Sequence, residues 1–356
     1  MSSPKYITAM DKDGLEHHYA VEDVVGQQLN RFKGWTCNAG IQTLYIDYDG
    51  SVWVANCAGA ANNPNTKALG HISEEWGYVG DIFLDDYTWP TRPVICPMTS
   101  CGCGADICTS KAAQPAPMRY NSIIPLRNAT SSTHLISMGM NYPWDKHVLW
   151  DIGRWCNYSC SYCWPDVHNK TDPHKKLDVM IKTVDRVVDE WAGGKQVRWA
   201  FGGGEPTVNP DFLPLMEHIR NRGGYILVVS NGSRNPEYYT KLANAIDCMQ
   251  LSVHFEFWKS DNFVNNIHAV LDAYKKKNGG WLDVKLMCKP GIVREAVEWK
   301  NKFTEIFETN TRPNPKFRNG QEKQGYATLV PIRGLNDSGE LVGYDPEELE
   351  LLNNNT

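Results

Sequence analysis

The chain has 356 residues, 42% of them hydrophobic and 11% aromatic, which is enough to bury the cores of one or two domains. Its 41 acidic and 36 basic residues give a net charge of −5, which argues against a general polyanion-binding surface, so a nucleic-acid partner is not indicated. No apolar run approaches the roughly 18 residues of a membrane span, and residues 1–5 lack the character of a signal peptide. We therefore expect a cytoplasmic protein without a membrane partner.

The eleven cysteines indicate metal ligation rather than a disulfide scaffold, because nine of them fall in two groups. The first group surrounds a predicted hairpin, whose strands 42–47 and 51–55 flank an Asp-Gly turn signal. Cys37 precedes this hairpin and Cys57 follows it, so strand pairing would bring the two thiols together. A glycine-containing loop that can turn sharply supplies four more thiols, namely Cys96, Cys101, Cys103 and Cys108.

After a linker at 111–146, apolar runs and amphipathic stretches alternate through the rest of the chain. This alternation predicts about six parallel βα units and therefore an α/β fold class. The predicted strands are 147–153, 196–201, 225–229, 249–253, 282–287 and 326–332. The predicted helices are 177–191, 211–221, 237–246, 263–277, 295–307 and 346–352. We expect a cysteine-rich domain at 1–110, the linker, and a βα domain at 147–356.

The second cysteine group follows the first of these strands, where Cys156, Cys160 and Cys163 form a C-x3-C-x2-C run. Three thiolates can converge on one metal centre, and a 4Fe–4S cluster held by three of them keeps one iron open. A fragment of a structural zinc site, or buried free thiols, are the alternatives. Glycine-rich or polar residues also follow the next three strands, at 202–206, 230–232 and 254–256. Loops after the strands build the active face of a βα barrel, so these segments should meet.

The cysteine run and the glycine-rich segment resemble the radical S-adenosylmethionine (radical SAM) enzymes. The resemblance implies a partial (β/α)6 TIM barrel, in which Cys156, Cys160 and Cys163 bind a 4Fe–4S cluster and SAM chelates the open iron through its amino and carboxylate groups. It also implies that a reductant such as flavodoxin or ferredoxin supplies one electron. SAM is then cleaved to a 5′-deoxyadenosyl radical that abstracts hydrogen from a substrate.

Further positions resemble SAM-binding elements of this family. Residues 202–206 resemble its GGE motif, whose backbone receives the SAM amino group, and glycines permit such close approach; a strand-ending turn is the alternative. The resemblance also covers an aromatic residue at the adenine pocket and strand-end contacts to the SAM carboxylate and ribose. The positions concerned are Tyr162, Gly203, Gly204, Glu205, Ser230, Asn231, Ser252 and His254. For Ser252 a satisfied strand hydroxyl, and for His254 a packed or substrate-facing imidazole, are equally compatible with the sequence.

Residues 34–110 resemble the auxiliary-cluster modules called SPASM and twitch domains, although such a module usually follows the radical SAM barrel. The resemblance implies one auxiliary 4Fe–4S cluster bound by Cys37, Cys57 and Cys96. Cys101 or Cys103 would be the fourth ligand, with Cys108 less favoured. A zinc knuckle built from four of these thiols is the alternative.

The sequence leaves the substrate open and assigns no catalytic side chain. A peptide or protein side chain is the first expectation, because auxiliary-cluster modules are frequent in peptide-modifying relatives. The same chemistry on a small molecule or nucleoside is the second, and a non-catalytic zinc or iron–sulfur binding protein is the third. Lys289 and Arg333, after the fifth and sixth strands, could neutralise a carboxylate or remain solvated.

Overall fold

The computed structural model describes residues 6–20, 24, 27–59, 68–72, 89–101, 109–113, 135–139, 146–163, 168–314, 320–332 and 343–355. The chain divides into two compact units, Met1–Trp150 with Lys182–Trp199 and Asp151–Ile181 with Ala200–Thr356. Cys103, Cys108, Arg333 and most of the expected linker lie outside the described residues, and the expected three segments stay a prediction. Within the described ranges, no helix is both long enough and apolar enough to cross a membrane.

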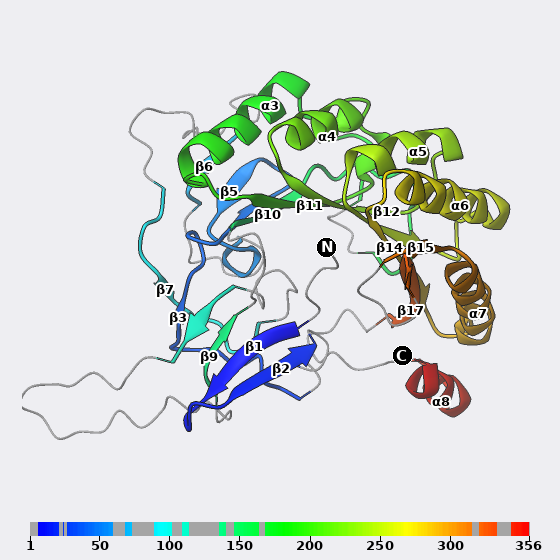
Figure 1. Ribbon diagram of the computed structural model, residues 1–356, viewed down its shortest axis with the longest axis horizontal. Helices are drawn as coiled ribbons and strands as arrows, with labels where there is room; N and C mark the ends of the chain where they lie inside the picture. Colours follow the sequence, from blue (N-terminus) through cyan, green and yellow to red (C-terminus); the bar gives the residue numbers. More distant parts are fainter. Residues whose placement is uncertain are drawn as a thin grey trace, which may run out of the picture. The chain divides into compact units, whose positions relative to one another are not determined.

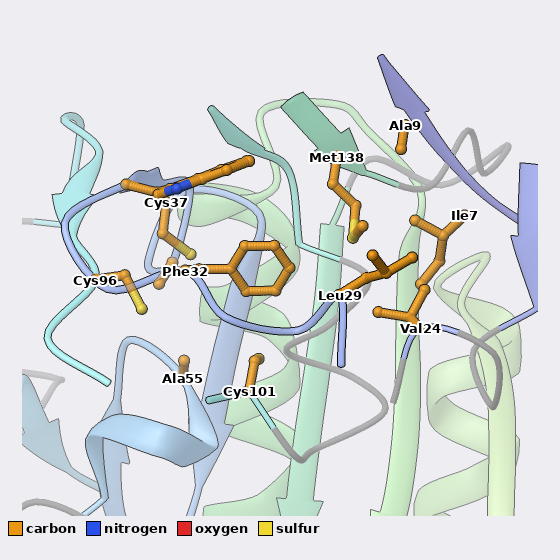
Figure 2. Packing of buried hydrophobic residues seen from close by; sticks show 12 residues of the cluster. Ile7, Ala9, Val24, Leu29, Phe32, Cys37, Ala55, Cys96, Cys101 and Met138 are labelled. Carbon is orange, nitrogen blue, oxygen red and sulfur yellow. The ribbon is translucent and has the colours of Figure 1, made fainter. Parts of the chain in front are cut away.

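The first unit contains an antiparallel sheet with the strand order β2-β1-β9-β8-β3-β7. Its strands are β1 (Tyr6–Asp11), β2 (Glu16–Ala20), β3 (Thr36–Cys37), β7 (Val94–Ile95), β8 (Lys111–Ala112) and β9 (Leu135–Gly139). An apolar core containing Ile7, Leu29, Phe32 and Met138 also includes three of the cysteines (Figure 2). Cysteines from distant parts of the sequence are thus buried in one core.

The predicted hairpin is confirmed as β4 (Thr43–Ile46) and β5 (Ser51–Trp53), which pair antiparallel. At its turn Gly50 has a φ of +104°, and the carboxylate of Asp49 accepts hydrogen bonds from the N–H and hydroxyl of Ser51 at 2.7 and 2.6 Å. The Asp-Gly signal therefore identified the turn correctly. The other strands of this group are β6 (Gly70–His71), antiparallel to β5, and β10 (Lys146–Asp151), parallel to β4.

The second unit contains the predicted parallel sheet, with the strand order β17-β14-β13-β12-β11, so the α/β fold class is confirmed. Its strands are β11 (Val197–Gly202, of which the second unit holds the residues from Ala200), β12 (Tyr225–Ser230), β13 (Cys248–Val253), β14 (Trp281–Cys288) and β17 (Gly325–Pro331). Its helices are α4 (Phe212–Asn221), α5 (Pro236–Ala245), α6 (Ser260–Lys276), α7 (Val293–Thr309) and α8 (Pro346–Asn355). Helix α3 (Leu177–Arg186), continued by a π-helical turn (Val187–Trp191), begins in this unit and ends in residues assigned to the first. Figure 1 shows α4 to α7 along one side of the strands. Short 3-10 turns, Asn56–Ala58 and Pro206–Val208, and an antiparallel pair, β15 (Thr311–Pro313) and β16 (Gln321–Lys323), complete the elements.

Strand β14 shows how the sequence distributes its side chains between the two faces of this sheet. Leu282, Val284 and Leu286 are fully buried, and helices α6 and α7 contact the strand. The alternate residues are half-buried, and two of them, Lys285 and Met287, line a cavity. One face of the sheet therefore packs on helices, and the other provides the walls of a site.

Candidate active site

A cavity of about 590 Å³ lies in the second unit, within the range of volumes typical of small-molecule and cofactor sites. The structure brings to its wall every residue expected to hold the first cluster or SAM. These residues are Cys156, Cys160, Tyr162, Cys163, Gly203, Gly204, Glu205, Ser230, Asn231, Ser252 and His254. Other lining residues were not singled out from the sequence, among them Tyr158, His168, Gln250, Lys285 and Met287.

The cysteine loop is anchored by backbone hydrogen bonds at its start. The N–H of Cys156 donates to the carbonyl of Asn169 at 3.0 Å, and the N–H of Asn169 donates to the carbonyl of Arg154 at 2.9 Å. Within the loop, the N–H of Tyr158 points at Cys156 Sγ, 3.4 Å away. The loop therefore has a fixed entry and presents its thiols to the cavity.

The three thiols suit a cluster better than a single ion. Burial raises the pKa of Cys156 to about 11 and that of Cys160 to about 12, so these groups need a cation to become thiolates at neutral pH. Among the described residues, no three His, Cys, Asp or Glu side chains lie close enough to share one metal ion. A 4Fe–4S cluster has no such requirement, because each thiolate binds a different iron.

His254, just after β13, contacts the cysteine loop directly. Its Nδ1 atom lies 3.4 Å from Cys160 Sγ and 2.9 Å from the hydroxyl of Tyr162, whose ring stacks on the imidazole at 6.0 Å. Burial lowers the pKa of His254 to about 4, so the imidazole is neutral at physiological pH. Tyr162 and His254, both expected at a SAM pocket, thus contact each other beside Cys160.

The glycine-rich segment is compact because it packs against the backbone that leads into the cysteine loop. The N–H of Gly204 donates to the carbonyl of Gly153 at 2.8 Å, and that of Glu205 donates to the carbonyl of Trp155 at 2.9 Å. A Cβ atom on Gly204 would lie 2.4 Å from the Trp155 carbonyl oxygen. Glycine at this position therefore permits close approach of two protein segments, in addition to any approach of a ligand.

Glu205 connects the ends of β11 and β12 through its buried carboxylate. It accepts hydrogen bonds from the hydroxyls of Thr207 and Ser230 at 2.5 and 2.7 Å and from the N–H of Asn231 at 2.6 Å. Burial raises the pKa of Glu205, while these hydrogen bonds favour its charged form. The side chain of Asn231 in turn donates to Asn157 Oδ1 at 2.9 Å, so the network reaches the cysteine loop.

A second acidic residue, Glu256, holds the tip of the loop. Its carboxylate accepts hydrogen bonds from the N–H and hydroxyl of Ser161 at 2.7 and 2.5 Å and forms an ion pair with Lys289 at 2.5 Å. Burial raises the pKa of Glu256, but the hydrogen bonds outweigh that effect and lower it to about 2. The sequence allowed Lys289 to neutralise a carboxylate. The carboxylate that it neutralises is that of Glu256, a residue of the protein itself.

The Glu256→Gln change is expected to lower the free energy of unfolding at pH 7 by about 1–2 kcal/mol, because Lys289 loses its ionic partner. Folding depresses the pKa of Glu256 from 4.5 to about 2. The stabilisation is therefore fully present at pH values above the pKa of Glu256 in the unfolded chain, and it disappears as the pH falls through the pKa of Glu256 in the folded chain. Urea unfolding of the cluster-free chain at several pH values measures the difference. Glu237→Gln, which removes an exposed pair with Lys241, is the control with a smaller effect. A wild-type advantage that persists undiminished near pH 2 would contradict this account.

In the first unit, the structure places four predicted auxiliary ligands together. Cys37, Cys96 and Cys101 belong to one buried core (Figure 2). Cys57 is partly buried and packs against this core. The N–H of Cys96 donates to the carbonyl of Trp35 at 2.8 Å, which ties the downstream loop to the segment that carries Cys37. These thiols therefore share one environment although they span 65 positions, 37 to 101.

Comparison with known proteins finds a family match for part of the chain. A model of the radical SAM superfamily matches residues 150–285. The mycofactocin maturase MftC of Mycobacterium ulcerans is 30% identical over 110 residues, which cover 31% of this chain and 28% of that protein. A GTP 3′,8-cyclase of Psychromonas ingrahamii is 28% identical over 185 residues, which cover 51% of this chain and 43% of that protein. The chain thus spans less than half the length of these relatives.

Solved structures align with part of the chain at low identity and low TM-score. The anSMEcpe structure with bound AdoMet aligns with a TM-score of 0.40 and 17% identity, covering 58% of this chain and 57% of that one. Streptococcus suis SuiB bound to precursor peptide SuiA also has a TM-score of 0.40, with 14% identity and coverage of 58% and 44%.

Proposed function

The chain belongs to the radical SAM superfamily of enzymes, and on this premise we propose that it cleaves SAM reductively at a 4Fe–4S cluster bound by Cys156, Cys160 and Cys163. The cluster, when bound, supplies the electron that releases a 5′-deoxyadenosyl radical for hydrogen abstraction from a substrate. One observation carries this proposal. The three thiols share a single cavity with the glycine-rich segment and the polar residues at the ends of β12 and β13.

In this function the protein's own side chains position the reactants. Asn231 and Glu205 link the end of β12 to the cysteine loop, and Glu256 fixes the loop's tip. His254 and Tyr162 form a neutral wall beside Cys160, which limits solvent access to the thiolates. These residues orient and shield the cofactors and need not exchange protons with the substrate.

Anaerobic incubation of the reconstituted protein with SAM and dithionite tests the proposal. We expect release of 5′-deoxyadenosine and methionine, and we expect flavodoxin or ferredoxin to replace dithionite as the electron donor. A protein that holds its irons and binds SAM but never releases 5′-deoxyadenosine would refute the proposed function.

We propose that the substrate is a peptide or protein side chain. The arrangement of cysteines in the first unit supports this proposal, as does a relative that is named a maturase. A small molecule or nucleoside is the second candidate, favoured by the relatives named GTP 3′,8-cyclase. Mass spectrometry of candidate peptides after turnover, set beside the same assay with nucleotides, distinguishes the two.

We also propose an auxiliary 4Fe–4S cluster, bound by Cys37, Cys57, Cys96 and either Cys101 or Cys103. The support is that the four of these cysteines that are described lie in or against one core. A cluster there could exchange electrons with a substrate radical or bind the substrate directly. A zinc ion on the same thiols is the competing occupant, although no three of the described cysteines lie close enough to share one ion.

The metal content of the purified protein distinguishes an auxiliary 4Fe–4S cluster from a zinc ion. We expect about seven to eight irons per wild-type chain, on the basis of one cubane per site. The double variant Cys37→Ser/Cys96→Ser should hold about four irons and still cleave SAM, because its losses are confined to the auxiliary site. Cys248→Ala, a thiol outside both groups, is the control that should keep the full iron content. About four irons together with one zinc in the wild type would replace the auxiliary cluster by a zinc site.

A further inference from the structure

Strand β14 contains a lysine, Lys285, although it belongs to a parallel sheet that packs on helices. Parallel strands covered by helices are usually continuous apolar runs. Lys285 nevertheless lies on the face of β14 that lines the cavity, beside Met287. Packing against α6 and α7 cannot explain it, because those helices lie against the other face.

The ammonium group of Lys285 has no anionic partner within ion-pair distance among the described residues. Its contact is with the ring of Tyr326, whose centroid is 5.2 Å from Nζ. Asp283, the nearest acid on the same face of β14, accepts a hydrogen bond from the indole of Trp281 at 2.5 Å. Lys289, by contrast, is paired with Glu256. Lys285 is also the only lysine or arginine among the described residues that line the cavity.

Polar groups that could accompany a bound anion surround Lys285. Ser252 on β13 is its register partner and lines the cavity, and Gln250 lies two residues earlier on the same strand face. His254 follows Ser252, the register partner of Lys285, by two residues. The backbones of Lys285 and His254 are therefore offset by about 7 Å along the strand direction. His254 in turn contacts Cys160. The cavity wall therefore combines the ammonium group of Lys285, the hydroxyl of Ser252 and the amide of Gln250, none of which belongs to the cysteine loop.

We propose that Lys285, with Gln250 beside it, binds a carboxylate of the substrate. This inference rests on the proposed function, in which the carboxylate of SAM lies at the cluster and leaves Lys285 to the substrate. One lysine matches the single charge of a carboxylate. A phosphate carries more charge and is usually bound by arginines or several donors, and no arginine in the described part of the cavity wall offers them.

Binding of two matched probes to the reconstituted, SAM-bound enzyme tests the proposal. The methylamides of N-acetylglutamate and N-acetylglutamine differ only in side-chain charge. We expect the glutamate probe to bind about 10- to 100-fold more tightly, as a charge-assisted hydrogen bond predicts. Lys285→Met should remove this preference without changing SAM affinity, and Lys285→Arg should retain most of it. Lys241→Met, which removes a surface lysine, should leave the preference intact.

Four results would overturn the assignment: equal binding of the two probes, binding of neither, a preference that survives in Lys285→Met, or a fall in SAM affinity in that variant. The last would assign Lys285 to SAM's own carboxylate. Stronger Lys285-dependent binding of N-acetylphosphoserine methylamide would replace carboxylate by phosphate. Release of 5′-deoxyadenosine is assayed separately. Its absence in the wild type refutes the proposed function, whereas its presence without a probe preference refutes only the role of Lys285.

Discussion

Cys160→Ala is expected to abolish the release of 5′-deoxyadenosine from SAM. Cys160 is buried and is the middle cysteine of its loop in the sequence, and no other described lining residue offers a fourth thiol to replace it. Loss of one of three ligands should prevent stable assembly of the cluster, so iron content should fall by about four per chain. We expect a loss of activity of at least about 10³-fold, the scale typical for removal of an essential catalytic group.

Chromatographic detection of 5′-deoxyadenosine, together with iron analysis of the same samples, measures this result. Cys288→Ala is the matched control, because Cys288 is a fully buried cysteine of the same unit that does not line the cavity. The control should keep both its irons and its activity. Turnover by Cys160→Ala at the wild-type rate would remove the cysteine loop from the mechanism.

The sequence predicted those parts of the fold that depend on short-range patterns. Alternating apolar runs and amphipathic stretches located the strands and helices of the second unit, and the Asp-Gly signal located the turn between β4 and β5. Strand-end positions then indicated which residues would meet at one cavity, because parallel strands place their carboxyl ends at the same edge. Those inferences needed no long-range information beyond the assumption of a parallel sheet.

Other features depend on contacts that a linear pattern does not contain. The pairing of β1 with β9 joins residues more than a hundred positions apart, and the polar N-terminal sequence gave no sign of it. The contact between His254 and Cys160 likewise requires the fold. Lys285 is different, because a charged residue inside a strand that should be apolar was visible in the sequence. The structure was needed to show that Lys285 lies on the face of β14 that lines the cavity.

Gly204→Ala is expected to disrupt SAM binding although it adds only one methyl group. The new Cβ would lie 2.4 Å from the carbonyl oxygen of Trp155 and 2.6 Å from that of Arg154, both backbone atoms that cannot rotate away. Either the glycine segment or the start of the cysteine loop must move. Such overpacking usually costs about 1–3 kcal/mol. We expect SAM affinity to fall at least about tenfold, since the displaced segments both line the cavity.

Gly153→Ala provides a control within the same contact. Gly153 accepts the hydrogen bond from the Gly204 N–H, yet a Cβ built on it meets nothing within 4 Å, and its φ is not in the left-handed region. Of these two glycines in contact, Gly204 should therefore not tolerate the added methyl group, whereas Gly153 should. Isothermal titration of SAM into each reconstituted variant, with thermal unfolding alongside, measures both effects. If Gly204→Ala binds SAM as Gly153→Ala does, the close packing at residue 204 is dispensable and the glycine has another role.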